Sequence, residues 1–292
     1  MVRWQEGRRS DNVEDRRGQR MPRAAVGGGA SLILVLLVFV LSGGDFNKAL
    51  NFFVQQQQQA KIGVGDDGAA PSPENDQEFD MASVILADTE DVWTDLFPQA
   101  FGKQYQPPTM VIFSQQTNTG CGIGEAAMGP FYCPADQQVY LDLAFFDELD
   151  RRFGAPGDFA QAYVIAHEVG HHIQNELGIS EQVHRAQQKL NDAEANQLSV
   201  RLELQADYLA GVWAHHAQKT RHILESGDVE EGLRAANAIG DDTLQRQATG
   251  HVNQERFTHG SSAQRVRWFK KGMQTGEVSP EILEAFFKSD EL

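Results

Sequence analysis

The chain has 292 residues, of which 41% are hydrophobic, so it is long enough for one large or two ordinary folded domains. Its formal net charge of −16 is unevenly distributed, because residues 1–23 hold seven arginines against four acidic residues and carry a net +3. The remainder therefore carries −19. So acidic a chain excludes nucleic acid as an expected partner, since binding phosphates needs a basic surface.

Residues 24–44 contain no charged residue, and their densest apolar part is residues 32–41. As a helix this stretch would be about 30 Å long, the thickness of a bilayer core. The positive-inside rule then predicts a single N-terminal transmembrane helix, with residues 1–23 as a cytoplasmic basic tail and the rest of the chain outside the cytoplasm. A cleaved signal peptide, cut near residues 40–42, is the alternative.

Residues 45–78 predict a flexible linker, because they contain five consecutive glutamines and then Gly- and Pro-rich sequence with little to bury. A folded domain is expected at residues 79–292. Apolar spacing predicts its first helix at residues 81–99. Alternating and β-branched residues predict strands at residues 109–114 and 138–143.

Residues 120–134 are punctuated by Gly and Pro and predict a loop, which holds the two cysteines of the chain, Cys121 and Cys133. Outside the cytoplasm this pair is expected to form a disulfide. Zinc ligation by the pair is the weaker alternative, because no Cys or His cluster lies near it in the sequence.

Four further helices are expected from helical spacing or from sequence signals at their ends. Asp158 with Gln161 resembles a capping box, and Gly178 suits the left-handed position after a helix end. Helical spacing predicts the second helix at residues 196–219. Ser261 with Gln264 predicts the start of a third, and Ser279-Pro280 starts a last one.

Residues 167–171, His-Glu-Val-Gly-His, lie within the first of these helices. His167 and His171 are four residues apart, so 3.6 residues per turn places them on one face. Neutral imidazoles are good zinc ligands, and Glu168 is placed to act on a metal-activated water. This is the H-E-x-x-H pattern of zinc peptidases.

The third ligand decides the class of site. A metzincin would continue with a Gly and a further His at the positions that hold Gln174 and Leu177, so that class is excluded. Glu203 and Asp207, also four residues apart, offer two carboxylates on one face of the next long helix. We expect Glu203 to bind zinc and Asp207 to accept the free N–H of a ligating imidazole. Two solvated charges on an amphipathic helix are the alternative.

These residues predict hydrolysis of a peptide bond. Zinc held by His167, His171 and Glu203 would lower the pKa of a water molecule, and Glu168 would act as the general base. His259, just before a helix start, is a candidate oxyanion stabiliser, although a structural role near the helix cap is the stronger alternative. Tyr208 is a weaker oxyanion candidate.

Several strings of the sequence resemble the neutral zinc metallopeptidase family of bacterial membrane-anchored proteins. They are residues 3–4, 10–17, 129–134, 166–174, 201–207 and 258–269, with the hydrophobic segment after the second of them. The resemblance implies a zincin-like fold at the bacterial cytoplasmic membrane, with His167, His171 and Glu203 at Zn²⁺ and Glu168 as base. It implies a peptide or protein substrate without naming one.

Both lines of reasoning predict an α+β domain with a small sheet over the motif helix. An edge strand from residues 129–133 or 138–143 would pair with an extended substrate. Two other functions remain open. A non-hydrolytic, zinc-stabilised envelope binding module would use the same ligands for folding. An intramembrane protease is disfavoured, because the motif lies far from the hydrophobic segment.

Overall fold

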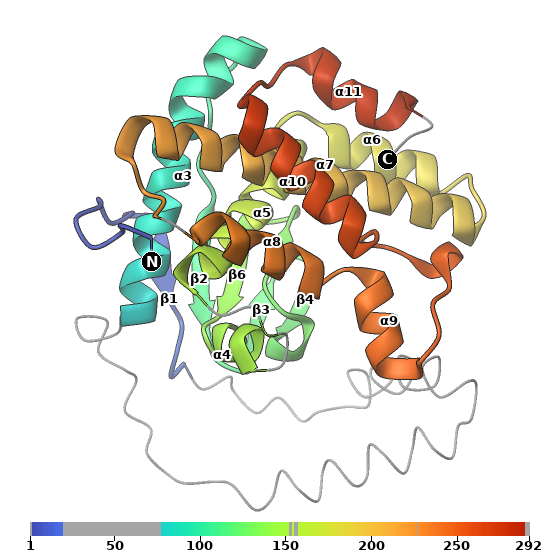
Figure 1. Ribbon diagram of the computed structural model, residues 1–292, viewed down its shortest axis with the longest axis horizontal. Coiled ribbons are helices and arrows are strands. Elements are labelled where there is room, and N and C mark those ends of the chain that lie inside the picture. Colours follow the sequence, from blue (N-terminus) through green and yellow to red (C-terminus); the bar gives the residue numbers. More distant parts are fainter. Residues whose placement is uncertain (1, 20–76, 152–153, 155–156, 226, 290–292) are drawn as a thin grey trace, which may run out of the picture.

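The computed structural model describes residues 2–19, 77–151, 154, 157–225 and 227–289 (Figure 1). The fold is α+β, as the sequence predicts, with one mixed sheet, one hairpin and mostly helices. The predicted transmembrane helix at residues 24–44 lies outside the described residues, as does nearly all of the predicted linker. Within the described ranges, no helix is long and apolar enough to span a bilayer.

The main sheet has four strands in the order β1 (Val13–Asp15), β2 (Thr109–Phe113), β6 (Gln138–Asp142) and β5 (Phe131–Cys133). Strands β1, β2 and β6 are parallel, and β5 runs antiparallel to β6. The two strands predicted from the sequence are confirmed to within one residue as β2 and β6. Because β2 and β6 have neighbours on both sides, β1 and β5 are the two edge strands of this sheet.

The loop predicted at residues 120–134 is wrong in part. A hairpin of β3 (Gln116–Thr119) and β4 (Gly122–Glu125) precedes a short 3-10 turn, η2 (Ala126–Met128), and β5 follows it. These strands are short, polar or Gly-rich, so they lack the apolar alternation that would predict them. Cys121 and Cys133 are joined by a disulfide, which ties β5 to the hairpin.

Residues 2–19 pack on the folded domain and do not form the separate tail expected from the sequence. Val2 and Trp4 are buried, and β1 pairs with β2 with Val13 opposite Met110. In Figure 1 the segment lies beside α3 (Gln77–Phe101). The expectation that the folded unit begins near residue 79 is therefore wrong, because the pairing joins segments that are distant in the sequence.

The arginines of this segment are used in folding. Each of the five in residues 2–19 forms an ion pair: Arg3–Glu225, Arg8–Glu90, Arg9–Asp80, Arg16–Glu14 and Arg17–Asp15. Glu90 is largely buried and also accepts from Ser10 and Asn12. A cluster of positive charge that satisfies acidic residues of the same domain is a weaker guide to membrane orientation than free positive charge would be.

The remaining helices form most of the domain. They are α4 (Ala144–Arg151), α5 (Asp158–Glu176), α6 (Ile179–Gln187), α7 (Asp192–Arg221), α8 (Asp228–Ala238), α9 (Asp241–Thr249), α10 (Ser262–Thr275) and α11 (Pro280–Lys288), with a 3-10 turn η3 (Gln254–Arg256). The capping box of Ser261 and Gln264 is confirmed at the start of α10. The box predicted at Asp158 is wrong: Gly157 caps α5, and the carboxylate of Asp158 accepts instead from the indole N–H of Trp4.

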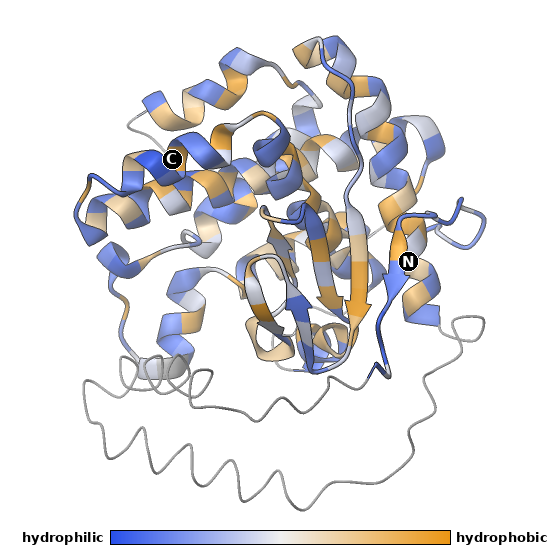
Figure 2. Ribbon diagram, turned by 180° about the vertical axis from the view of Figure 1, so that it is seen from behind, coloured by the Kyte–Doolittle hydropathy of each residue, from blue (hydrophilic) through white to orange (hydrophobic). Residues whose placement is uncertain are grey.

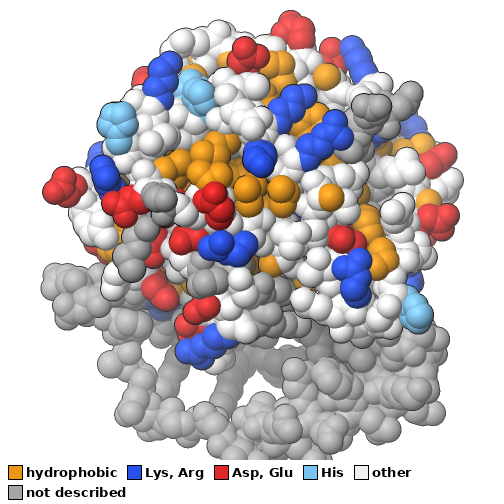
Figure 3. Space-filling view, viewed as in Figure 1, with side chains coloured by type: hydrophobic (Ala, Val, Ile, Leu, Met, Phe, Trp, Pro, Cys, Tyr) orange, Lys and Arg blue, Asp and Glu red, His pale blue; other side chains and the backbone are white. Residues whose placement is uncertain are grey.

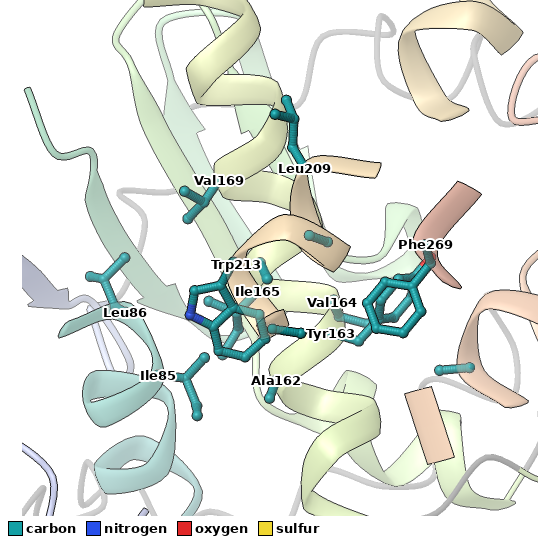
Figure 4. Packing of buried hydrophobic residues seen from close by; sticks show 14 of the residues in the cluster. Ile85, Leu86, Ala162, Tyr163, Val164, Ile165, Val169, Leu209, Trp213 and Phe269 are labelled. Carbon is teal, nitrogen blue, oxygen red and sulfur yellow. The ribbon is translucent and has the colours of Figure 1, made fainter. Parts of the chain in front are cut away.

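Helix α5, which carries the His-Glu-Val-Gly-His motif, lies at the centre of the core. It has a buried apolar stripe: Ala162, Ile165, Ala166, Val169 and Ile173 are at most 2% exposed. Ile85 and Leu86 of α3 and Trp213 of α7 surround this stripe in Figure 4. Figure 2 shows hydrophobic residues in the central strands of the sheet, and hydrophobic and hydrophilic residues alternating along the helices. Burial on several sides holds α5 rigidly, as a metal site requires.

The surface in Figure 3 carries basic and acidic side chains interspersed around apolar areas. The described residues of this face therefore present no extended area of one charge sign.

Candidate metal centre

The structure brings the three predicted ligands together. His167 and His171 are one turn apart on α5, and Glu203 reaches them from α7. One ligand atom of each lies within 4.8 Å of the other two. The three side chains that the sequence suggested as ligands thus form one cluster.

The spacing of these atoms suits zinc. Tetrahedral zinc has bonds of about 2.0–2.2 Å, which places neighbouring ligand atoms about 3.4 Å apart. Nε2 of His167 lies 3.2 Å from Oε2 of Glu203, and Nε2 of His171 lies 3.4 Å from Oε1 of Glu203. Two imidazoles and one carboxylate are also a donor set that zinc prefers. The residues present therefore fit the ion.

Gly170 allows α7 to come this close to α5. A Cβ at this position would lie 2.9 Å from the backbone oxygen of Ala206 and 3.1 Å from its Cα. Any larger residue would push α7, and with it Glu203, away from the two histidines. The glycine between the motif's glutamate and its second histidine thus has a packing role in the site.

Asp207 fixes the ring of His167. Its Oδ1 accepts from Nδ1 of His167 at 2.9 Å, which leaves Nε2 facing Glu203. Asp207 is fully buried, and it also binds Arg265 of α10 through Nε at 2.9 Å and Nη2 at 3.0 Å. The hydroxyl of Tyr163 donates to the same carboxylate. The contact that the sequence predicts for Asp207 is present, whereas Arg265 and Tyr163 are partners that the sequence reasoning missed.

Gln174 performs the corresponding role for His171. Its Oε1 lies 2.9 Å from Nδ1 of His171, and its Nε2 donates to the backbone of Leu202 and to Gln205. The two donations fix the orientation of the amide, so Nδ1 of His171 carries the proton and Nε2 is free for a metal. Sequence reasoning used Gln174 only to exclude the metzincins, although its i+3 spacing from His171 was a usable signal.

The carboxylates change the pKa values of both imidazoles. Burial opposes protonation of His167, but Asp207 and then Glu203 outweigh it and raise its pKa from 6.5 to about 10. Burial opposes protonation of His171 too, and Glu203 raises its pKa. For Glu203, burial would raise the pKa, but His171 and His167 hold it well below its usual range. Protons and zinc therefore compete for the same nitrogens.

Glu168 lies where a general base is needed. It is 7% exposed and lines a cavity of about 670 Å³ together with His167, His171 and Glu203. Burial raises the pKa of its carboxyl group, which moves it toward the range of an effective proton acceptor.

The chain can now be compared with known proteins. A family model described as "Putative neutral zinc metallopeptidase" matches residues 2–281. The chain belongs to this family. It is 48% identical over 299 residues to "Uncharacterized protein YpfJ" of Escherichia coli (strain K12), and the match covers 99% of this chain and 100% of the relative. It is 44% identical over 209 residues to "Uncharacterized protein Rv2575" of Mycobacterium tuberculosis (strain ATCC 25618 / H37Rv), covering 68% of this chain and 67% of the relative. No solved structure matches.

Membership of the zinc metallopeptidase family confirms the resemblance drawn from the sequence and makes peptides the implied class of substrate. The matched region includes the N-terminal segment that carries β1. This agrees with the packing of that segment on the domain.

His259 lines the same cavity as Glu168 and the three metal ligands. Its imidazole is about half exposed, and Nδ1 lies 3.3 Å from Oδ1 of Asp241. Asp241 also accepts the backbone N–H groups of Thr258, His259 and Gly260, so one carboxylate holds the whole turn. The hydrogen bond that His259 donates to the Asp241 carboxylate raises the His259 pKa, which favours a donor form of the ring. Asp241 is a further residue that the sequence reasoning missed.

Tyr208 and His172 point away from the ligands. Tyr208 donates its hydroxyl to the backbone oxygen of Glu277 at 2.7 Å and does not line the cavity, so its proposed oxyanion role is wrong. His172 is 1% exposed and contacts Tyr132 and the backbone of Gln106. Its direction is the one expected for a residue next to a ligand on a helix.

Proposed function

We propose that the protein is a zinc-dependent endopeptidase with a zincin-like site. The observation that carries this proposal is a cluster of two imidazoles and one carboxylate, with one ligand atom of each within 4.8 Å of the other two, beside a buried glutamate at a cavity. Two histidines on one helix, a glutamate from a later helix and an edge strand at the cavity support the zincin-like arrangement.

His167, His171 and Glu203 would hold the zinc ion, which supplies Lewis-acid polarisation of water and of the substrate carbonyl. Glu168 would accept the proton of the attacking water and deliver it to the leaving amine. Asp207 and Gln174 keep the two imidazoles in the tautomer that presents Nε2. His259, at the cavity, would donate a hydrogen bond to the carbonyl oxygen as negative charge develops.

Strand β5 is the proposed edge for an extended substrate. Among the described strands it is paired on one side only, by β6, and residues 128–132 line the cavity. A peptide added along the free side would form backbone hydrogen bonds and pass over α5. Of the two edges that the sequence left open, β6 is already paired on both sides.

The non-hydrolytic binding module is the competing proposal. A structural zinc site is closed by four protein ligands, whereas a catalytic site keeps one position open. Within the described ranges, the metal-ligating group consists of three residues and borders a cavity. A buried carboxyl group next to the ligands also has no use in a purely structural site.

Cleavage of a peptide library by the purified protein tests the proposed function. We expect cleavage that is lost after zinc removal by a chelator and recovered when stoichiometric zinc is returned. Stoichiometric zinc binding without any cleavage would favour the binding module.

We also propose attachment to the bacterial cytoplasmic membrane through residues 24–44, on the basis of their composition. The single-pass orientation would place residues 1–23 and the catalytic domain on opposite sides. The pairing of β1 with β2 and the burial of Val2 and Trp4 argue against that separation. Cleavage near residue 42 would likewise cut β1 from the rest of the sheet. The disulfide favours an oxidising compartment, so we place both parts on the extracytoplasmic side, and residues 24–44 would then enter the membrane from that side without crossing it.

Labelling of single cysteines with a membrane-impermeant reagent tests this location. Glu6→Cys and Lys189→Cys lie at exposed positions in the two parts. We expect both to label in intact, outer-membrane-permeabilised cells. Labelling of Lys189→Cys alone would support the single-pass orientation, and labelling of both only after lysis would place the domain in the cytoplasm.

A further inference from the structure

Strand β5 borders the metal cavity but is weakly held by the sheet. It has three residues, and within the described chain its ladder partner is β6 alone. So short a pairing is marginal by itself. Its height above α5 therefore depends on contacts outside the sheet.

Tyr132, the middle residue of β5, makes such a contact with α5. Its phenol oxygen lies 3.1 Å from Nδ1 of His172 and 3.1 Å from Nδ2 of Asn175. Nε2 of His172 lies 2.6 Å from the backbone oxygen of Gln106, which can only accept. Nε2 therefore carries the proton, Nδ1 is an acceptor, and the Tyr132 hydroxyl donates to it while accepting from Asn175.

The two neighbours of Tyr132 point to the other face of the sheet. Phe131 stacks on Tyr140 with ring centroids 5.0 Å apart, and Cys133 is bonded to Cys121. In β5, Tyr132 is thus the residue whose side chain forms hydrogen bonds with α5. Its partner His172 directly follows the ligand His171 and is 1% exposed.

We propose that Tyr132 is a positioning residue that sets the height of the substrate-binding strand β5 over the metal helix α5, through its hydroxyl contacts with His172 and Asn175. This rests on the proposed function. A substrate paired with β5 must bring its carbonyl to the metal ligands, so a strand held loosely would bind peptide less well. The ligands themselves do not depend on this hydroxyl, since Asp207 and Gln174 orient them.

Tyr132→Phe tests the proposal by removing one oxygen atom, and Tyr105→Phe is a matched control. Both rings pack edge-on against His172, with centroid distances of 5.4 Å for Tyr132 and 5.7 Å for Tyr105. The Tyr105 hydroxyl is buried without a hydrogen-bond partner among the described residues. The two variants therefore differ mainly in whether a hydrogen bond is lost.

The measurements are zinc affinity, kcat and KM for a fluorescein-labelled casein peptide, and the Kd of that peptide for zinc-loaded protein that also carries Glu168→Gln. For Tyr132→Phe we expect KM and Kd to rise roughly three- to tenfold, the effect of one buried hydrogen bond, with kcat and zinc affinity unchanged. Tyr105→Phe should match the unaltered enzyme.

Unchanged peptide Kd in Tyr132→Phe, or an equal change in Tyr105→Phe, would overturn this proposal while leaving the peptidase function intact. A fall in zinc affinity would also overturn it, because Tyr132 would then support the ligands. Absence of cleavage by the unaltered, zinc-loaded enzyme would instead overturn the proposed function, and the positioning role with it.

Discussion

Replacement of Asp207 by Asn should lower both the zinc affinity and the free energy of unfolding, and the two effects can be measured separately. Asp207 and Arg265 are 0% and 2% exposed and form two short N–H···O contacts. A buried guanidinium left without its carboxylate costs about 3–5 kcal/mol of the free energy of unfolding. In Asn an NH2 donor replaces one of the two oxygens, so either Oδ1, which accepts from His167, or Oδ2, which accepts from Nε of Arg265, is lost as an acceptor. Loss of the acceptor for a ligating imidazole lowers metal affinity roughly 10- to 100-fold, about 1.4–2.7 kcal/mol.

The assay combines urea unfolding of metal-free protein with a competitive zinc titration. Adding Arg265→Met to Asp207→Asn removes the uncompensated charge, so we expect most of the unfolding free energy to return while zinc affinity stays low. Asp88→Asn is the control, since Asp88 is a buried partner of Arg221 outside the metal cavity. Asp88→Asn should lower the free energy of unfolding and leave zinc affinity unchanged. Unchanged zinc affinity in Asp207→Asn, or its recovery in the double variant, would refute the orienting role.

Three further outcomes follow from the site. Zinc binding near neutral pH should release protons from His167, whose pKa is about 10, and from His171, whose pKa is raised. Apparent zinc affinity should then fall with falling pH, roughly tenfold per pH unit for each proton released. Calorimetry in two buffers of different ionisation enthalpy counts these protons. Zinc binding without proton release would contradict the raised pKa values. Gly170→Ala should cost about 1–3 kcal/mol of unfolding free energy and weaken zinc binding, because its Cβ would meet Ala206; retained zinc affinity would show that α7 adapts. His259→Ala should lower kcat roughly 10²- to 10³-fold with zinc affinity unchanged, whereas a change in stability alone would assign His259 to the turn held by Asp241.

The parts of the site that lie on one helix were accessible from the sequence. Helical periodicity places His167 with His171, and Glu203 with Asp207, so two faces with the correct chemistry could be predicted separately. Their meeting depended on chemical plausibility rather than on a contact signal. The structure adds the reason why the helices meet closely, since Gly170 leaves room for the backbone at Ala206.

The parts that the sequence did not predict join distant segments. Arg265 reaches Asp207 from 58 positions away, and Tyr132 reaches His172 across 40 positions. Local patterns carry no information about such pairs. Strand β1 is the clearest case: its three residues, Val-Glu-Asp, are strand-like only because β2 offers an edge. The arginines around it were interpreted as a topology signal, although they pair with acids of the same domain.

The central claim is that His167, His171 and Glu203 hold a zinc ion and that Glu168 acts as the general base of peptide hydrolysis. The most direct measurement compares the unaltered protein with Glu168→Gln for zinc stoichiometry and peptide cleavage in the same preparations. We predict one zinc ion per chain in both and cleavage by the unaltered protein alone. Cleavage retained by zinc-loaded Glu168→Gln protein would contradict the account.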